Sequence, residues 1–300
     1  MSRTRVVAGS VSWVAQKVTD YKQLVKFRLT LTVVFSALMA FFIASKDGIS
    51  LTATLVLAMG GFLVTGAANA LNQVLEKDYD RLMKRTADRP LAAGRMPVSE
   101  AVLAAGLMAM AGIMLLALFN VWAAFFGMLS LVAYAFLYTP LKRISTMAIP
   151  VGAVPGALPM LIGCVAAEGG LTPLAIALFS FQFAWQFPHF WSIGWLGYDD
   201  YRKAGYKMLP ERDGERDPNA GIYSALYALA LVPLGFSLYW LGFAGLWSAI
   251  FVGVLSLGYA WLGLNLYRKQ DRKAALKLMF GSLLYLPVAL VVFYLDKAVI

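Results

Sequence analysis

Residues 51–71 read LTATLVLAMGGFLVTGAANAL, a run of 21 residues without a charged side chain. Wound as an α-helix that rises about 1.5 Å per residue, such a run crosses the roughly 30 Å hydrocarbon core of a lipid bilayer. Similar apolar runs recur, and only 14% of the 300 residues are charged, against roughly 25% in soluble domains. A transmembrane β-barrel would show short alternating segments instead. The sequence therefore predicts an all-α fold, a polytopic membrane helix bundle.

We expect about nine transmembrane helices, at residues 29–45, 50–75, 99–118, 120–138, 147–166, 171–195, 219–239, 242–266 and 276–295. The N-terminal segment and every second loop lie on the same side of the membrane. Together they hold 24 of the 26 Lys and Arg residues, which leaves only Lys46 and Lys297 on the other side. Basic residues accumulate in cytoplasmic loops. The N-terminus should therefore be cytoplasmic and the C-terminus outside, in a multi-pass protein of the inner (plasma) membrane whose charged face meets the cytoplasm.

The N-terminal segment differs from the spans. Residues 1–28 lack the uninterrupted apolar region of a cleavable signal. Their apolar residues can share one helical face, as in an interfacial helix: Trp13, Val14, Val18, Tyr21 and Leu24. We expect 1–28 to be a cytoplasmic or interfacial segment and 29–300 to be a single transmembrane domain.

The net charge of +10 follows from this topology. Basic loops at a membrane surface meet anionic headgroups, so membrane lipid is an expected partner. Nucleic acid is not, because its binding calls for a basic patch on a soluble domain. Cys164 is the only cysteine and falls inside a span, which excludes an intramolecular disulfide and a CxxC metal site.

The first long charged loop carries an acidic pattern. Asn72, Glu76, Asp80 and Lys84 are four residues apart, so a helix that continues out of the membrane aligns them on one face. Carboxylates in such a row can hold Mg²⁺, which commonly uses one or two carboxylates together with a substrate's phosphates. Basic residues that can neutralise a diphosphate follow directly: Lys84, Arg85 and Arg89. The alternative for each residue singly is a solvated juxtamembrane face.

The second long loop follows a polar stripe inside a span. Gln182, Gln186, His189 and Asp200 fall on one face of a regular helix, with His189 about 16 Å from Asp200 and well inside the membrane. From the residues alone, this only histidine could simply hydrogen-bond a neighbouring helix. A third basic cluster, Lys142 and Arg143, is by itself only a topology signal.

At these motifs the chain resembles the UbiA-type intramembrane prenyltransferases, over nearly its whole length, and within them the heme O synthase subfamily. The superfamily's N-x-x-x-D-x-x-x-D matches Asn72, Glu76 and Asp80, with Glu76 in place of the first Asp. Further subfamily motifs are matched by residues 85–91, 138–143, 156–163, 185–191 and 200–210. The second D-x-x-x-D is incomplete, because Leu196 and Ala204 stand four residues from Asp200. Asp199 is an alternative carboxylate, and the choice between Asp199 and Asp200 stays open.

The resemblance implies transfer of a farnesyl group from farnesyl diphosphate to a vinyl group of haem b, giving heme O and pyrophosphate, with Mg²⁺ as cofactor. It also implies a downstream partner, a haem-modifying enzyme or terminal oxidase assembly. The implied roles are catalysis for Asn72, Glu76, Asp80 and Asp200; metal binding for Glu76, Asp80, Asp199 and Asp200; diphosphate binding for Lys84, Arg85, Arg89, Lys142 and Arg143; and haem binding for His189.

Two other functions are weighed against this one. A related enzyme of the same superfamily could prenylate an aromatic acid such as 4-hydroxybenzoate, although His189 and its Trp and Gln neighbours argue against it. A secondary transporter shares the many spans and the Gly- and Pro-broken helices, but its ionisable residues should lie at the membrane midplane. Here the charged residues gather at one surface.

Overall fold

The computed structural model describes residues 3–46, 48–212 and 214–297. Its helices are α1 (Arg3–Leu24), α2 (Phe27–Ala44), α3 (Leu51–Asp80), α4 (Val98–Ala117), α5 (Val121–Val132), the π-helical η1 (Ala133–Tyr138), α6 (Thr139–Ile144), α7 (Ala148–Glu168), α8 (Pro173–Leu196), α9 (Tyr198–Lys203), α10 (Ala220–Trp240), α11 (Leu246–Lys269) and α12 (Arg272–Leu295). A short antiparallel hairpin, β1 (Glu211–Arg212) and β2 (Glu215–Arg216), follows α9.

Eight segments of the described residues are long and apolar enough to cross a membrane: α2, α3, α4, the continuous run α5–η1–α6, α7, α10, α11 and α12. Their positions confirm eight of the predicted spans and the prediction of a polytopic helix bundle. The ninth, at 171–195, is present as α8 but does not reach the same hydropathy, because Gln182, Gln186 and His189 interrupt it. α8 packs inside the bundle against α7, α10 and α12.

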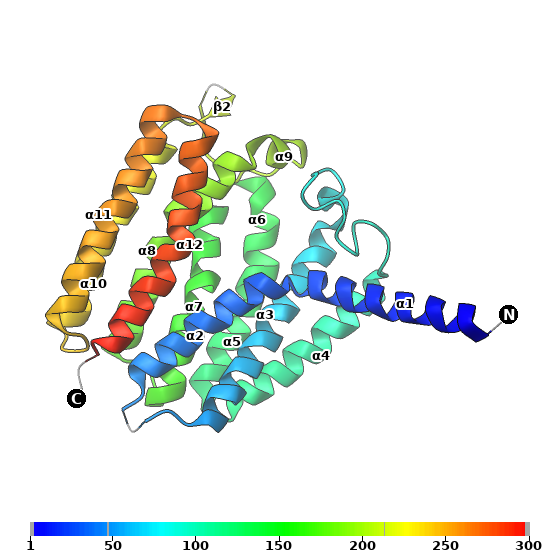
Figure 1. Cartoon of the computed structure of the whole chain (residues 1–300), viewed down its shortest axis with the longest axis horizontal. Helices are drawn as coiled ribbons and strands as arrows, with labels where there is room; N and C mark the ends of the chain where they lie inside the picture. Colours follow the sequence, from blue (N-terminus) through cyan, green and yellow to red (C-terminus); the bar gives the residue numbers. More distant parts are fainter. Residues whose placement is uncertain (1–2, 47, 213, 298–300) are drawn as a thin grey trace.

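The charged loops lie together at one end of the bundle. Figure 1 shows the segment after α3, the short helix α9 and the β-hairpin at its top, while the C-terminus and the connection between α2 and α3 lie at the bottom. Both long loops that the sequence singles out are thus at the same end. Which side of a membrane this end faces stays a prediction.

α7 forms the centre of the bundle, where it packs against α2, α5 and α8. Of its 18-residue apolar stretch, 78% is buried inside the protein. Small residues allow this close approach. A Cβ atom on Gly163 would lie 2.1 Å from the carbonyl oxygen of Ala37 on α2, and one on Gly152 would lie 2.5 Å from the Tyr138 ring. Only glycine therefore fits at these two contacts, and they fix η1 and α2 on either side of α7.

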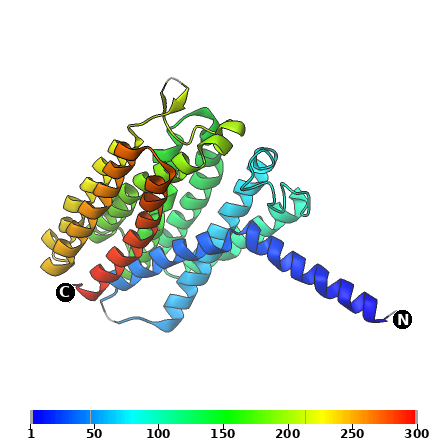
Figure 2. The ribbon, with the colours of Figure 1, turned by 45° about the horizontal axis from the view of Figure 1, so that its top comes forward.

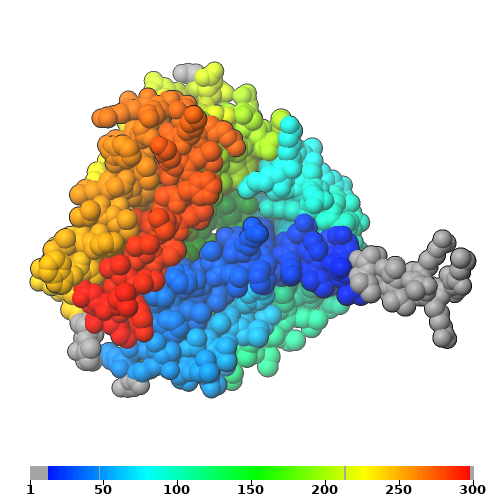
Figure 3. All heavy atoms as spheres, viewed as in Figure 1, coloured from blue at the N-terminus to red at the C-terminus, as the bar shows by residue number. Residues whose placement is uncertain are grey.

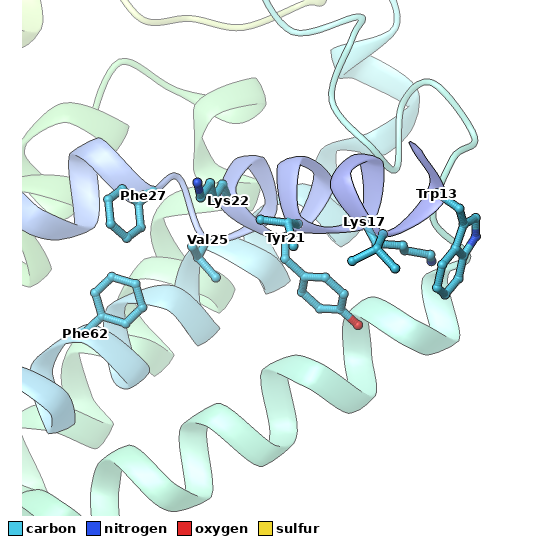
Figure 4. Close-up of a pocket in the computed structure, with 9 residues that line it drawn as sticks. Trp13, Lys17, Tyr21, Lys22, Val25, Phe27 and Phe62 are labelled. Carbon is cyan, nitrogen blue, oxygen red and sulfur yellow. The ribbon is translucent and has the colours of Figure 1, made fainter. Parts of the chain in front are cut away.

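α1 extends away from the bundle, as Figure 2 shows. Polar contacts tie its C-terminal half to the first charged loop and α4. Lys17 pairs with Glu100 at 2.8 Å, and Arg95 pairs with Asp20 at 2.9 Å. Beneath the helix is a shallow apolar groove of about 400 Å³, bordered by Trp13, Tyr21, Phe27 and Phe62 (Figure 4). This geometry suits the predicted interfacial position of residues 1–28, which stays a prediction.

Candidate active site

The acidic pattern of the first loop lies on the last turns of α3. Asn72, Glu76 and Asp80 are all buried, with exposed fractions of 0%, 4% and 1%, and their four-residue spacing places them on one face of the helix. The helix ends at Asp80. The expectation that it continues through Lys84 is wrong: the chain turns after Arg81, and Lys84 is exposed.

Each buried carboxylate on this face has a basic partner from another segment. Lys142 on α6 donates to Glu76 Oε1 at 2.7 Å, and the pair is buried. Arg89 donates from Nη1 to both oxygens of Asp80, at 2.9 and 2.8 Å. Two carboxylates and two cations therefore alternate in a space largely closed to water, where electrostatic interactions are stronger than at a protein surface.

A further cation, Lys26, reaches this cluster from the junction of α1 and α2. Its backbone is left-handed, with φ of 47°, and its ammonium donates to Asn72 Oδ1 at 2.7 Å and to the Tyr134 hydroxyl at 3.4 Å. Burial, together with the positive charges of Arg89 and Lys142, lowers the pKa of Lys26 well below its usual value. Its ammonium contacts neutral oxygen atoms, so it can accept an anion without first breaking an ion pair.

The π-helical turn η1 completes the floor of the cluster. Thr139 accepts a hydrogen bond from Asn72 Nδ2 at 3.0 Å, and the Tyr138 ring lies 4.6 Å from Lys142 Nζ. A π-helical turn often marks a functional site because it redirects side chains of an otherwise regular helix. Here Tyr134 of the turn contacts Lys26, and Thr139, directly after the turn, contacts Asn72 on α3.

The second charged loop folds over the first. Met83, Tyr201, Ala204, Tyr206 and Met208 form one small apolar cluster. The Arg85 guanidinium donates to the Tyr201 hydroxyl at 2.8 Å across this contact. Of the predicted diphosphate ligands, Lys142, Arg89 and Arg85 thus gather at the two loops. Arg143 instead hydrogen-bonds the Tyr79 hydroxyl on the exposed side.

The two aspartates of the second loop lie apart from Glu76 and Asp80. The regular helix assumed from His189 to Asp200 is wrong, because α8 ends at Leu196 and α9 starts after Gly197. Asp199 is exposed and pairs with Arg216 at 2.9 Å, and Asp200 lies 4.0 Å from Lys203. Among the described residues, no three His, Cys, Asp or Glu side chains are close enough together to hold a metal ion.

His189 lies inside the bundle on α8, facing α12. Its ring stacks on Trp185 with centroids 5.2 Å apart, and its Nδ1 is 2.7 Å from the Ser282 hydroxyl. Ser282 Oγ is also within hydrogen-bond distance of the Met279 carbonyl oxygen, so it accepts from the ring in the tautomer that carries its hydrogen on Nδ1. The other ring nitrogen, Nε2, then carries the lone pair. The imidazole is therefore oriented by its neighbours as a metal-ligating histidine usually is.

A hollow opens on the side of the molecule. The space-filling view in Figure 3 shows it between α12, α2 and the segment that follows α3, with helices from the middle of the chain at its floor. The hollow faces sideways rather than along the bundle axis. An amphipathic molecule could therefore reach it from a bilayer.

Comparison with protein families identifies the fold. Residues 33–284 match the model described as the UbiA prenyltransferase family. The chain belongs to this family. Among curated relatives, it is 42% identical to a protoheme IX farnesyltransferase of Cytophaga hutchinsonii over 284 residues, which cover 94% of this chain and 99% of the relative. The family resemblance read from the motifs is confirmed, and the chain is an integral membrane protein of the UbiA family.

Solved structures of this family share the fold. A structure of digeranylgeranylglyceryl phosphate synthase superposes with a TM-score of 0.77 at 17% identity, covering 94% of this chain and 98% of that one. A UbiA homolog from Archaeoglobus fulgidus bound to GPP and Mg²⁺ gives 0.67 at 15% identity, covering 91% and 99%. At these identities the likeness shows the fold alone.

Two residues of the site were missed by sequence reasoning. Lys26 lies just before the first predicted span, a position that by itself indicates only membrane topology. No sequence pattern marks Tyr206 as a site residue, because nothing in the spacing or composition of its charged loop distinguishes this tyrosine from others in the chain. Its side chain is 5% exposed, and burial, together with the neighbouring Glu76 and Asp80 carboxylates, raises its pKa.

Proposed function

We propose that this protein transfers a farnesyl group from farnesyl diphosphate to a vinyl group of haem b, giving heme O and pyrophosphate. A vinyl carbon forms a bond to C1 of the farnesyl group as the C1–O bond to the diphosphate breaks. Water then adds its hydroxyl group to the other vinyl carbon and releases a proton. The observation that carries the proposal is the oriented His189 imidazole inside a bundle whose charged end is built for an anion. The name shared by curated relatives with about 40% identity, protoheme IX farnesyltransferase, agrees with it.

The charged end supplies the diphosphate half of the reaction. Negative charge grows on the leaving diphosphate as the C1–O bond breaks, so cations held in place around it lower the barrier. Lys26, Arg89 and Lys142 are buried or half-buried and already positioned by hydrogen bonds. We assign them, with Arg85, to the diphosphate. Arg143 and Lys84 lie at the rim and are proposed to act in attraction of the substrate.

The acidic residues fit a magnesium ion in part. Glu76 and Asp80 are buried one helical turn apart and present carboxylate oxygens, the ligands that Mg²⁺ takes together with substrate phosphates. When bound, Mg²⁺ would neutralise charge on the diphosphate. Asp200 would have to approach from α9 to add a third carboxylate, whereas Asp199 is held by Arg216. We therefore assign the metal to Glu76 and Asp80, with Asp200 preferred over Asp199 and Asn72 positioned beside them.

The haem half rests on His189. Its Nε2 lone pair is the group that binds haem iron in many proteins, and Ser282 and Trp185 hold the ring in place. A hydroxybenzoate acceptor would leave this oriented histidine without a role. A transporter would leave the buried pairs around Glu76 and Asp80 without one. We propose that the protein lies in the plasma membrane, with the charged end of the bundle facing the cytoplasm. Its product is proposed to pass to a haem-modifying enzyme or an oxidase.

The test is direct turnover. Purified protein is incubated with haem b, farnesyl diphosphate and Mg²⁺, and the pigments are separated by chromatography and weighed by mass spectrometry. We expect a heavier, more hydrophobic haem, and we expect His189→Ala to abolish both haem binding and product. Trp13→Phe, far from the site, serves as the control. Product from 4-hydroxybenzoate but none from haem would overturn the proposal.

A further inference from the structure

Tyr206 is buried at the charged end, and its hydroxyl makes no hydrogen bond of ordinary length and angle within the described residues, although the Glu76 carboxylate is close enough to interact with it. Three other tyrosines of this face have partners. Arg143 donates to Tyr79, Tyr198 donates to Glu211, and Arg85 donates to Tyr201. A buried hydroxyl without a partner costs free energy, on the order of 1–3 kcal/mol. Such a group in a folded protein calls for an explanation, and a ligand that is not yet bound is one.

The surroundings of Tyr206 define the ligand. Its ring lies 5.8 Å from Lys142 Nζ, and its hydroxyl is close enough to Glu76 and Asp80 for both carboxylates to raise its pKa. A tyrosine phenol has an ordinary pKa of about 10, so it is protonated at neutral pH and can act as a hydrogen-bond donor. It lies among the same cations that flank the two carboxylates, where an anion would be bound.

The backbone holds Tyr206 rigidly in this position. Gly205 adopts a left-handed conformation, with φ of 71°, and lets the chain reverse so that the Tyr206 N–H donates to the Tyr201 carbonyl at 2.8 Å. The next residue, Lys207, donates its N–H to the Lys142 carbonyl at 2.7 Å. The rings of Tyr79 and Tyr201 pack against the Tyr206 ring, with centroids 6.1 and 6.2 Å away. The second loop is thus fastened to α6 at the point where Tyr206 meets the cluster.

We propose that the Tyr206 hydroxyl donates a hydrogen bond to the diphosphate of the prenyl substrate and so closes the site from the second loop. This inference rests on the proposed function only in that the substrate is a diphosphate; it does not depend on haem as acceptor. It gives the second loop a role that its aspartates do not supply, since Asp199 is bound to Arg216 on the surface.

The test compares Tyr206→Phe with Tyr198→Phe, a matched loss of a phenol whose hydroxyl bonds Glu211 on the same loop. Pyrophosphate is the probe, with its affinity measured by titration calorimetry in Mg²⁺-containing detergent solution. We expect Tyr206→Phe to weaken pyrophosphate binding about 10- to 100-fold, as for a lost hydrogen bond to a charged group. Tyr198→Phe should bind as the wild type does, and haem affinity should be unchanged in both variants.

A second measurement keeps the inference testable if Tyr206→Phe folds poorly. 3-Fluorotyrosine placed at position 206 reports directly on its own environment by fluorine NMR. Its resonance should shift when pyrophosphate is added, whereas that of the same label at position 198 should not. No shift at 206, or pyrophosphate affinity within twofold of wild type in Tyr206→Phe, overturns the inference. If the wild-type protein did not convert haem, the proposed function would be overturned, but the pyrophosphate-binding results would still decide this inference.

Discussion

Removal of Lys142 should destabilise the protein through Glu76. The Lys142 ammonium is 2.7 Å from the carboxylate, and the side chains are only 11% and 5% exposed. Breaking a buried ion pair from one side typically costs about 3–5 kcal/mol, because the remaining charge stays buried without compensation. Lys26 and Arg89 also act on Glu76 electrostatically, which places the expected cost for Lys142→Met at the lower end, about 3 kcal/mol.

A double-mutant cycle isolates this pair. Glu76→Gln combined with Lys142→Met removes both charges, so the double variant should regain most of the stability that Lys142→Met loses, with a coupling energy of about 2 kcal/mol. Unfolding is followed by far-ultraviolet circular dichroism in detergent, where a loss of about 3 kcal/mol lowers the thermal midpoint by roughly 6–12 °C.

The matched control is Lys203→Met. Lys203 is 59% exposed and lies 4.0 Å from Asp200, and an exposed pair of this kind contributes about 0–1 kcal/mol. If Lys142→Met were as stable as Lys203→Met, or if the coupling energy with Glu76→Gln were zero within error, the buried pair would not be the electrostatic centre of this site.

Three further predictions concern other parts of the site and its frame. Ser282→Ala should free the His189 ring and weaken haem binding several-fold in a spectrophotometric titration, with His189→Ala losing it. Lys26 has a pKa lowered by burial and by neighbouring cations, so it loses its proton at a lower pH than an ordinary lysine. Pyrophosphate affinity should therefore fall as the pH rises through that pKa, and this slope should be absent in Lys26→Met. Gly163→Val should destabilise the bundle by about 1–3 kcal/mol, as overpacking does, because even a Cβ atom would meet the Ala37 carbonyl; a melting temperature equal to that of the wild type would contradict it.

The spans and the acidic face could be read from the sequence for one physical reason. Apolar length and four-residue spacing are local properties, and a helix converts them directly into position. Asn72, Glu76 and Asp80 accordingly lie where the pattern places them. The break at Gly197 was harder to foresee, because a regular helix and a broken one share the same residue spacing up to Leu196.

Partners far apart in the chain could not be predicted in this way. Lys142 looked like a topology signal and proved to be the partner of Glu76, 66 residues away. Lys84 continues the four-residue spacing of Asn72, Glu76 and Asp80, but it does not lie on their helical face, because the helix ends at Asp80. Tyr206 depends on a turn at Gly205 and on the docking of one loop on another, and neither leaves a periodic trace in the sequence.

The π-helical turn at Ala133–Tyr138 has a consequence for how related chains compare in length. Such a turn is an α-helix that has gained one residue, so loss of one residue there would rewind it and rotate one flank by about 100° relative to the other. Tyr134 lies within this turn and contacts Lys26, whereas Lys142 follows the turn and contacts Glu76 on α3. A single-residue gap at this point in an alignment would therefore mark a chain whose anion site is built differently, even where every charged residue is kept.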